Sequence, residues 1–279
     1  MPTLKRTAPT TSFFPGALAV VTGAGSGIGR ATALELTAHG AAVVVVDIDE
    51  AGAEKTAATC AERGARGAWV ARCDVSSYEE VVALAERVST EHGVPDIVVN
   101  NAGVGMTGRL TDMSIEDWRW IRSINLDGVL HGCRAFGPAM LERGSGHVVN
   151  VSSGLAYTMR ATEPAYVTTK AAVLALSRCL QADWASRGVG VSAICPGVIN
   201  TPIIDSTRFA GEEPEQRRHD AAKLFRRGHK PETVAKAIVD AIRRNRAVVP
   251  VGWEARAGWW LNRVVPVSTA QYLAGKGNV

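Results

Sequence analysis

Seven short runs of small and β-branched apolar residues recur along this chain and constrain its fold more than any other feature. The runs are Ala17–Thr22, Ala42–Asp47, Ala68–Cys73, Asp96–Asn100, His147–Ser152, Val189–Ile194 and Ala247–Val251. Most of them lack polar alternation, which is typical of strands that are covered on both faces. Segments with helical spacing separate the runs. The sequence therefore predicts an α/β fold with a parallel seven-stranded sheet and helices on both faces.

The predicted helices lie between these runs, and most of them end beside a glycine. We expect helices at Gly27–His39, Glu50–Arg63, Ser77–His92, Ile115–Leu141, Pro164–Arg187 and Pro231–Arg246. Glycine commonly follows a helix because it adopts the left-handed conformation without strain. The widest irregular stretch, Gly197–Lys230, is interpreted as a substrate lid, since long connections are usually functional or mobile.

Length and composition fit one large folded domain. We expect residues 1–15 to be an N-terminal extension and residues 16–251 to be one domain. Residues 252–279 would form a tail, packed on the domain or at an interface. Hydrophobic residues make up 46% and charged residues 21%, which argues against extensive disorder. The net charge of +4 is spread along the chain, so we expect a mildly basic surface and no nucleic-acid partner.

Several other classes of protein are disfavoured by the pattern of single residues. The five cysteines are odd in number and form no C-x-x-C pair, which argues against a disulfide framework or a zinc site. Reduced thiols in a cytoplasmic protein are expected instead. The six histidines show no H-E-x-x-H spacing, so no metal is predicted. No signal peptide and no run of about 18 apolar residues is present, so no transmembrane helix is expected.

A glycine-rich loop follows the first predicted strand directly. It reads Thr22-Gly-Ala-Gly-Ser-Gly-Ile-Gly29 and opens the first helix. Glycines let the backbone approach a ligand closely, and the free N–H groups of a helix start favour a pyrophosphate. The spacing Gly23-x-x-x-Gly27-x-Gly29 differs from the common G-x-G-x-x-G pattern. A glycine-rich turn that binds nothing is the alternative.

The acidic residue Asp47 ends the second predicted strand, after four valines. An acid about 20 residues beyond the glycines can accept both ribose hydroxyl groups and repel a 2′-phosphate. No Arg or Lys lies inside the glycine loop to attract that phosphate. The sequence therefore favours NAD over NADP, although Asp47 could instead cap the following helix, as Asp49 could.

A tyrosine and a lysine four residues apart lie on one face of a predicted helix. An ammonium group such as that of Lys170 favours the phenolate form of a neighbouring phenol such as Tyr166. A free tyrosine titrates near ~10, too high for a base at neutral pH without such help. Ser152 and Ser153 end the fifth predicted strand, at the sheet edge where α/β proteins bind ligands.

Taken together, these residues resemble the short-chain dehydrogenase/reductase family, in its single-domain branch. The resemblance covers roughly Leu18 to Val251 and implies a doubly wound Rossmann fold. The matching motifs are Thr22-Gly-x-x-x-Gly-x-Gly29, Asp74 after a strand, Asn100-Asn101-Ala102-Gly103, Asn125, Ser153 thirteen residues before Tyr166, Lys170, and Pro196-Gly197 with Thr201.

The resemblance implies a catalytic role for four residues. Tyr166 would be the general acid/base, with Lys170 lowering its pKa and holding the nicotinamide ribose. Ser153, which the thirteen-residue spacing selects over Ser152, would orient the substrate oxygen. Asn125 would lie at a break in its helix and support a water that relays protons to Lys170. The resemblance also implies that this chain forms a homodimer or homotetramer.

The same resemblance implies the residues that contact NAD. Asn101 and Asp74 would line the adenosine side, and Pro196–Thr201 would lie along the nicotinamide, with Thr201 near its carboxamide. The expected cofactor-binding residues are Gly23, Ser26, Gly27, Ile28, Gly29, Asp47, Asp74, Val75, Asn101, Ala102, Gly103, Tyr166, Lys170, Pro196, Gly197, Ile199 and Thr201.

The function implied is interconversion of a secondary alcohol and its ketone by hydride transfer to and from NAD. An NADPH-dependent ketoreductase and a non-catalytic NAD(H) sensor are the alternatives. Apolar residues in two loops suggest a hydrophobic substrate, polycyclic or terpenoid-like, although ordinary packing explains them as well. Those residues are Leu155, Ala156, Tyr157, Met159, Ile199, Ile203, Ile204 and Phe209.

Tryptophans beside arginines mark the tail, where Trp253, Trp259 and Trp260 accompany Arg256 and Arg263. Four interpretations stay open at this point. The tail could be a helix at a membrane surface, a subunit interface, a cover over the substrate pocket, or a helix packed on its own domain.

Overall fold

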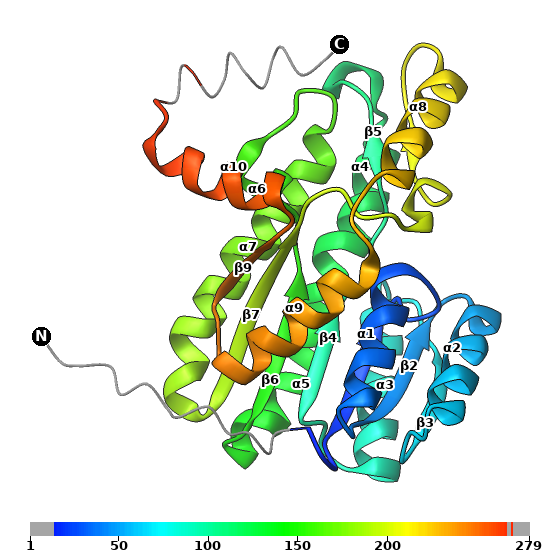
Figure 1. Ribbon diagram of the computed structural model, residues 1–279, viewed down its shortest axis with the longest axis vertical. Helices are drawn as coiled ribbons and strands as arrows, with labels where there is room; N and C mark the ends of the chain where they lie inside the picture. The colour runs from blue at the N-terminus through cyan, green and yellow to red at the C-terminus, as the bar shows by residue number, and fades with distance from the viewer. Residues whose placement is uncertain (1–13, 267–268, 270–279) are drawn as a thin grey trace, which may run out of the picture.

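A computed structural model describes residues 14–266 and residue 269. Most of the expected N-terminal extension (residues 1–13) and part of the tail (267–268 and 270–279) lie outside the described residues. The rest of the chain forms one sheet between two layers of helices (Figure 1).

The central sheet has seven parallel strands in the order β3-β2-β1-β4-β6-β7-β9. The strands are β1 Leu18–Thr22, β2 Ala42–Asp47, β3 Ala68–Arg72, β4 Ile97–Asn100, β6 Gly146–Val151, β7 Val189–Pro196 and β9 Val248–Val251. Each lies within two residues of its predicted bounds, so the predicted sheet is confirmed. The chain progresses toward one edge from β1 to β3 and toward the other from β4 to β9. The point between β1 and β4 is where such sheets bind ligands.

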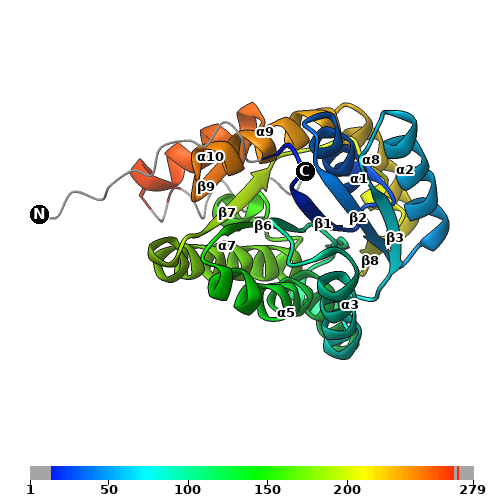
Figure 2. The ribbon, with the colours of Figure 1, turned by 90° about the horizontal axis from the view of Figure 1, so that it is seen from below.

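Figure 2 shows the two helical layers on opposite faces of the sheet. One layer contains α1 (Gly27–Ala38), α2 (Glu50–Glu62) and α9 (Pro231–Arg244), and the other contains α3 (Tyr78–His92), α5 (Gly128–Arg143) and α7 (Pro164–Trp184). The valines of β2 explain the missing polar alternation. Val43 and Val45 pack toward α1, whereas Val44 and Val46 pack toward α3.

The helix predicted at Ile115–Leu141 is not continuous, which corrects the sequence prediction. It divides into α4 (Ile115–Arg122), a π-helical turn (Ser123–Asp127) and α5. Such turns insert one residue into the helical hydrogen-bond ladder and are frequent at functional sites. The break implied for Asn125 is therefore present, at the centre of this turn.

The stretch Gly197–Lys230 is not irregular, and this too corrects the prediction. It holds a 3₁₀ turn at Pro202–Ile204, the short strand β8 (Arg208–Phe209) and helix α8 (Pro214–Arg226). The strand β8 pairs in parallel with β5 (Met106–Thr107), a two-stranded sheet that the sequence did not suggest. Two residues per strand are too few for an apolar alternation to be visible.

Two further helices pack together beside the sheet edge that carries β9. The short helix α6 (Leu155–Thr158) contacts α10 (Trp253–Val264), the helical part of the tail. The Tyr157 ring meets Trp259 edge-on at 5.2 Å, and its hydroxyl donates to the Ala255 carbonyl at 2.8 Å. The opposite side of α10 leaves Trp253 and Trp260 exposed. Among the described residues, no helix is long and apolar enough to cross a membrane.

A buried histidine between β6 and β7 gives the fold a predicted sensitivity to acid. The Nε2 atom of His147 lies 2.8 Å from the Ser192 hydroxyl, which itself donates to the Arg246 carbonyl. Because the single proton of the Ser192 hydroxyl is donated to the Arg246 carbonyl, the Ser192 oxygen can only accept from His147. The His147 ring therefore carries its proton on Nε2, and Nδ1 is unprotonated. Burial lowers the pKa of His147 from 6.5 to about 4.

We expect His147 to make the native state less stable as the pH falls from 6.5 to 4. In this window the unfolded chain binds a proton that the native imidazole does not, so unfolding becomes easier by roughly 3 kcal/mol. Urea unfolding at pH 7 and pH 4.5 measures the effect. The variant His147→Gln keeps a side-chain donor for Ser192 without titrating, and its stability should fall less with acid. Equal losses in both proteins would contradict the prediction.

Candidate active site

A cavity of about 1300 Å³ opens at the carboxyl edge of the sheet, above the point between β1 and β4. It runs from Asp47 at one end, past the glycine loop, to Tyr166 and the residues of α8 at the other. Pockets for drug-sized ligands commonly measure roughly 300–1,000 Å³. This cavity therefore has room for a dinucleotide and a second small molecule.

The glycine loop is shaped so that its backbone forms one wall of the cavity. Gly23 and Gly27 adopt positive φ angles of 62° and 50°, which side chains other than glycine rarely tolerate. A methyl group on Gly29 would overlap the carbonyl oxygen of Gly23. The loop leads into the N-terminus of α1, where free N–H groups and the helix dipole favour an anion. These residues fit a pyrophosphate.

A threonine and an asparagine support the glycine loop from behind through hydrogen bonds. The hydroxyl oxygen of Thr22 lies 3.0 and 3.1 Å from the amide nitrogens of Asn101 and Ala102, which donate to it. The Asn101 side chain donates back to the carbonyls of Thr22 and Gly23. Thr22 therefore ties the ends of β1 and β4 together. The sequence motif included it, but sequence reasoning assigned it no role.

Asp47 lies at the cavity wall and also supports the glycine loop. Its Oδ2 accepts from the Gly25 amide at 2.8 Å, and its Oδ1 accepts from the Asp49 amide at 3.0 Å. Asp49 is the residue that precedes α2, and its own side chain makes no capping bond. Asp47 thus combines a turn-forming role with a position in the cavity. Further along this wall, Asp74 accepts from the amide and hydroxyl of Ser76, and Val75 lies beside it.

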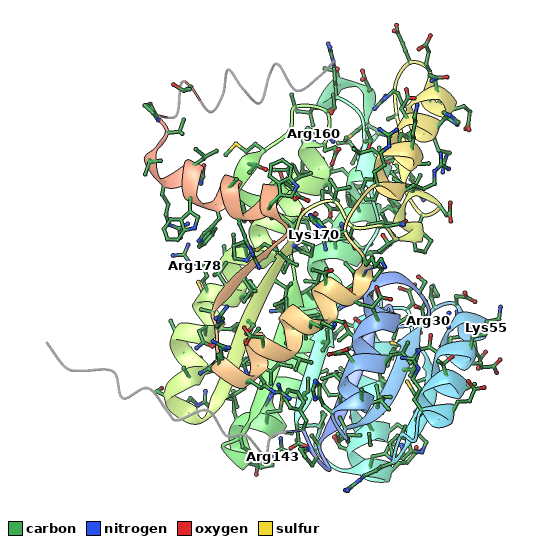
Figure 3. The ribbon with its side chains drawn as sticks, in the orientation of Figure 1. Arg30, Lys55, Arg143, Arg160, Lys170 and Arg178 are labelled. Atoms are coloured by element: carbon green, nitrogen blue, oxygen red, sulfur yellow. The ribbon has the colours of Figure 1, made fainter. Side chains whose placement is uncertain are left out.

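The reacting end brings Tyr166 and Lys170 of α7 next to Ser153 at the end of β6. The Ser153 hydroxyl is near enough to Tyr166 to lower its pKa, while the Lys170 ammonium lies 5.9 Å from the centre of the Tyr166 ring. Figure 3 labels Lys170 near the middle of the molecule. Lys170 is buried and donates to the Val151 carbonyl at 3.0 Å. The three side chains form one group at the cavity floor.

The proton affinities of this group differ from the sequence expectation. Burial raises the pKa of Tyr166 to about 12, and the Ser153 hydrogen bond opposes this only in part. Burial likewise lowers the pKa of Lys170 to about 8. The expected lowering of the Tyr166 pKa by Lys170 is absent here, because desolvation dominates and the ammonium is turned toward Val151. At neutral pH, Tyr166 is therefore a phenol, ready to donate a proton.

The two adjacent serines have different surroundings. Ser152 is buried, and its hydroxyl donates to the Lys170 carbonyl at 2.7 Å, so it fixes α7 against β6. Ser153 accepts from the Leu155 amide at 3.1 Å and contacts Tyr166. Ser153 is therefore the serine that lies beside Tyr166.

Asn125 lies behind the cavity wall and is fully buried. Its amide oxygen accepts from the Val104 N–H at 2.8 Å, and its amide nitrogen donates to the Val104 carbonyl at 2.9 Å. A methyl group on Gly103 would meet both Asn125 and Lys170 at 3.2 Å, so the two side chains flank this glycine. The Asn125 side chain thus holds the loop after β4, and the water relay stays a prediction.

The segment after β7 crosses the cavity toward the glycine loop. A methyl group on Gly27 would meet the Thr201 side chain at 3.1 Å, so the segment and the loop touch. The Gly154 amide donates to the Pro196 carbonyl at 2.8 Å, and buried Ile199 pairs with His229. The segment therefore lines the same cavity as the glycine loop and Tyr166.

The structure brings almost all predicted site residues to this one cavity. Gly29 and Asn125 are the exceptions, since they support its wall from behind. The residues that line it are Gly23, Ser26, Gly27, Ile28, Asp47, Asp74, Val75, Asn101, Ala102, Gly103, Ser153, Tyr166, Lys170, Pro196, Gly197, Ile199 and Thr201. Among the residues that the structure describes, no group of three or more His, Cys, Asp or Glu could hold a metal.

The outer end of the cavity is lined by both apolar and charged residues, whereas the sequence predicted an apolar wall. Apolar residues lining it include Leu155, Met159, Ile203, Ile204, Phe209, Leu224 and Phe225. Tyr157 and Ala156 do not line it, because they pack beneath α10 instead. Arg160 and Glu163 form an ion pair of 2.8 Å at the rim, and Figure 3 places Arg160 further out than Lys170.

Comparisons with known proteins point to one family. The sequence profile of the short chain dehydrogenases matches residues 17–210. EphD of Mycobacterium tuberculosis, described as a probable oxidoreductase, is 48% identical over 261 residues, which are 91% of this chain and 44% of EphD. The chain thus spans less than half the length of that relative. D-threitol dehydrogenase of Mycolicibacterium smegmatis is 40% identical over 189 residues, 67% of this chain and 72% of that enzyme.

A solved structure gives the same result. A short chain dehydrogenase/reductase from Burkholderia phymatum, crystallised in complex with NAD, is 31% identical and superimposes with a TM-score of 0.83. The match covers 90% of this chain and 93% of that protein. Fold and sequence therefore agree over most of the chain.

Proposed function

We propose that this chain, which belongs to the short chain dehydrogenase family, oxidises a secondary alcohol to its ketone, or reduces the ketone, with NAD as the hydride carrier. The observation that carries the proposal is the joint placement of Ser153, Tyr166 and Lys170 at the floor of a cavity whose other end is the glycine loop. The hydride carrier would then face the substrate carbon, while the proton donor Tyr166 would face the oxygen bonded to that carbon.

The residues present fit a nicotinamide dinucleotide. The glycine loop and the start of α1 would hold its pyrophosphate, and Asp47 would accept the hydroxyl groups of its adenosine ribose. Lys170 would hold the other ribose, and Pro196–Thr201 would lie along the nicotinamide. When bound, this cofactor supplies or accepts the hydride.

The protein would then supply the proton and the orientation. In ketone reduction, the Tyr166 phenol donates its proton to the substrate oxygen, while the Ser153 hydroxyl donates a second hydrogen bond to that oxygen. In alcohol oxidation, Tyr166 must first lose its proton. A pKa of about 12 opposes this loss, and a positively charged oxidised nicotinamide beside the phenol would favour it.

The preference for NAD rests on the carboxylate of Asp47. We expect Asp47→Asn to narrow the NAD/NADP ratio of kcat/KM by about tenfold, because the charge that repels a 2′-phosphate is lost. Asparagine keeps an oxygen that can accept from the Gly25 amide, so the loop should be retained. Asp183→Asn, at an exposed position of α7 that does not line the cavity, is the matched control and should leave the ratio unchanged. An unaltered ratio in Asp47→Asn would locate the preference elsewhere.

The substrate that we propose is a hydrophobic secondary alcohol. Ile203, Phe209 and Leu224 support this, since they line the outer cavity. An NADPH-dependent ketoreductase is the second candidate, favoured by the phenol form of Tyr166, which suits reduction. A non-catalytic NAD(H) sensor is less consistent with a complete set of Ser153, Tyr166 and Lys170. A homodimer or homotetramer remains a prediction from the family.

The test is a cofactor titration followed by an alcohol panel. NADH and NADPH binding would be followed by fluorescence, and secondary alcohols from small to polycyclic would then be screened for NADH formation. Binding of NADH with turnover of bulky alcohols supports the proposal. Binding without turnover across a broad panel favours the sensor, and binding of neither dinucleotide contradicts the proposed function.

A further inference from the structure

Glu254, in the first turn of α10, reaches from the tail into the wall of the cavity. Its Oε1 accepts from the Val198 amide at 2.8 Å, and its Oε2 lies 3.0 Å from Nε2 of His229. The carboxylate packs directly against Gly197, since a methyl group there would overlap it. One side chain of the tail thus contacts two segments that are far apart in the sequence.

These two segments are the start and the end of the stretch 197–230. The His229 amide donates to the Val198 carbonyl at 2.9 Å, and the Asn200 amide donates to the His229 carbonyl at 2.8 Å. Glu254 completes this arrangement, because it binds the Val198 amide and the His229 ring. The base of the stretch that holds β8 and α8 is therefore closed by a residue outside it.

The same contacts fix the segment proposed to lie along the nicotinamide. Gly197 donates to the Val251 carbonyl at 2.8 Å, immediately before the helix that carries Glu254. Hydrogen bonds from a backbone N–H to a carboxylate are stronger than those to a neutral acceptor. The contact with His229 is partly exposed, with 33% and 26% of the two side chains accessible, and contributes little by itself. The hydrogen bond from the Val198 amide to Glu254 is therefore the contact that mainly holds this segment in place.

We propose that Glu254 is a positioning residue for the nicotinamide half of the cofactor, acting through Val198 and the Pro196–Thr201 segment. The inference rests on the proposed function, since it needs a nicotinamide cofactor. Only a carboxylate of this length offers two acceptor oxygens for two donors at once. A glutamine offers one acceptor oxygen, and an alanine offers none.

The experiment compares NADH with ADP-ribose, which lacks the nicotinamide but keeps the pyrophosphate and adenosine. Glu254→Ala should raise the Kd of NADH about tenfold and leave the Kd of ADP-ribose within twofold. Glu254→Gln should restore part of the NADH affinity. A merely structural role would weaken both ligands together, because a loosened fold disturbs the whole cavity.

The matched control is Tyr157→Phe. It removes the other side-chain hydrogen bond between α10 and the domain without touching Val198, so the Kd of NADH should stay within twofold. The inference would be overturned if Tyr157→Phe lost as much NADH affinity as Glu254→Ala. It would also be overturned if Glu254→Ala weakened ADP-ribose as much as NADH, or if it changed the Kd of neither ligand. Failure of the unaltered protein to bind NADH and NADPH would overturn the proposed function, and this inference with it.

Discussion

Replacing Tyr166 with phenylalanine should lower kcat for alcohol oxidation and ketone reduction by about 10³-fold or more, with the Kd of NADH changed less than threefold. Phenylalanine keeps the ring that fills the cavity floor beside Ser153 and removes only the hydroxyl group. Positioned general acids contribute about 10²–10⁴-fold in many enzymes, and Tyr166 is the side chain proposed for that role beside Ser153.

Steady-state kinetics in both directions and fluorescence titration with NADH measure these two effects. Tyr78→Phe is the matched control, because Tyr78 is exposed on α3, packs against His131 with tilted rings and does not line the cavity. It should keep kcat and NADH affinity. Near-normal turnover of the Tyr166 variant would remove this residue from its proposed role, and the proton donor would have to be sought elsewhere in the cavity.

Replacing Gly29 with alanine should weaken NADH binding about 100-fold or more. The added methyl group would overlap the Gly23 carbonyl oxygen and approach the Asn101 side chain, so the glycine loop could not keep its shape. The pyrophosphate would then lose the aligned N–H groups at the start of α1. Gly29 does not line the cavity, so the effect would be transmitted through the loop backbone.

Isothermal titration with NADH measures this change, and the control separates it from general loss of stability. Gly93→Ala lies at the end of α3 with no atom within 4 Å of the added methyl group. Its φ of 94° and ψ of 175° make alanine strained, at a cost of about 1–3 kcal/mol, without a clash against the neighbouring elements. Gly93→Ala should lower the unfolding midpoint and keep NADH affinity. Normal NADH affinity in Gly29→Ala would exclude the loop as the pyrophosphate site.

The parallel sheet could be predicted from sequence because its signal is local and repeated. Four successive valines in β2 can only be buried if both faces of the strand are covered. The order of Gly29, Ser153, Tyr166 and Lys170 along the chain likewise suffices to identify the family. Each of these features depends on residue type and spacing, which the sequence shows directly.

Other features could not be predicted, because they depend on residues that meet only in three dimensions. The pairing of β5 with β8 joins two-residue strands about 100 positions apart, and neither has a pattern of its own. The contacts of Glu254 with Val198 and His229 leave no trace in the tail sequence, because a single glutamate forms no pattern. An apolar residue in a loop sequence also does not show which neighbours its side chain meets. Tyr157 packs beneath α10, which agrees with the alternative of ordinary packing and not with a cavity wall.

The sequence by itself thus determined the sheet and the family, and it supplied the side chains that we propose as proton donor and cofactor contacts. The tertiary structure decided the electrostatic state of those side chains. Tyr166 and Lys170 are four residues apart on one helix, and their spacing predicts a lowered phenol pKa. Burial instead raises the pKa of Tyr166 to about 12 and lowers that of Lys170 to about 8. Desolvation depends on everything that surrounds a group, and only the folded chain specifies those surroundings.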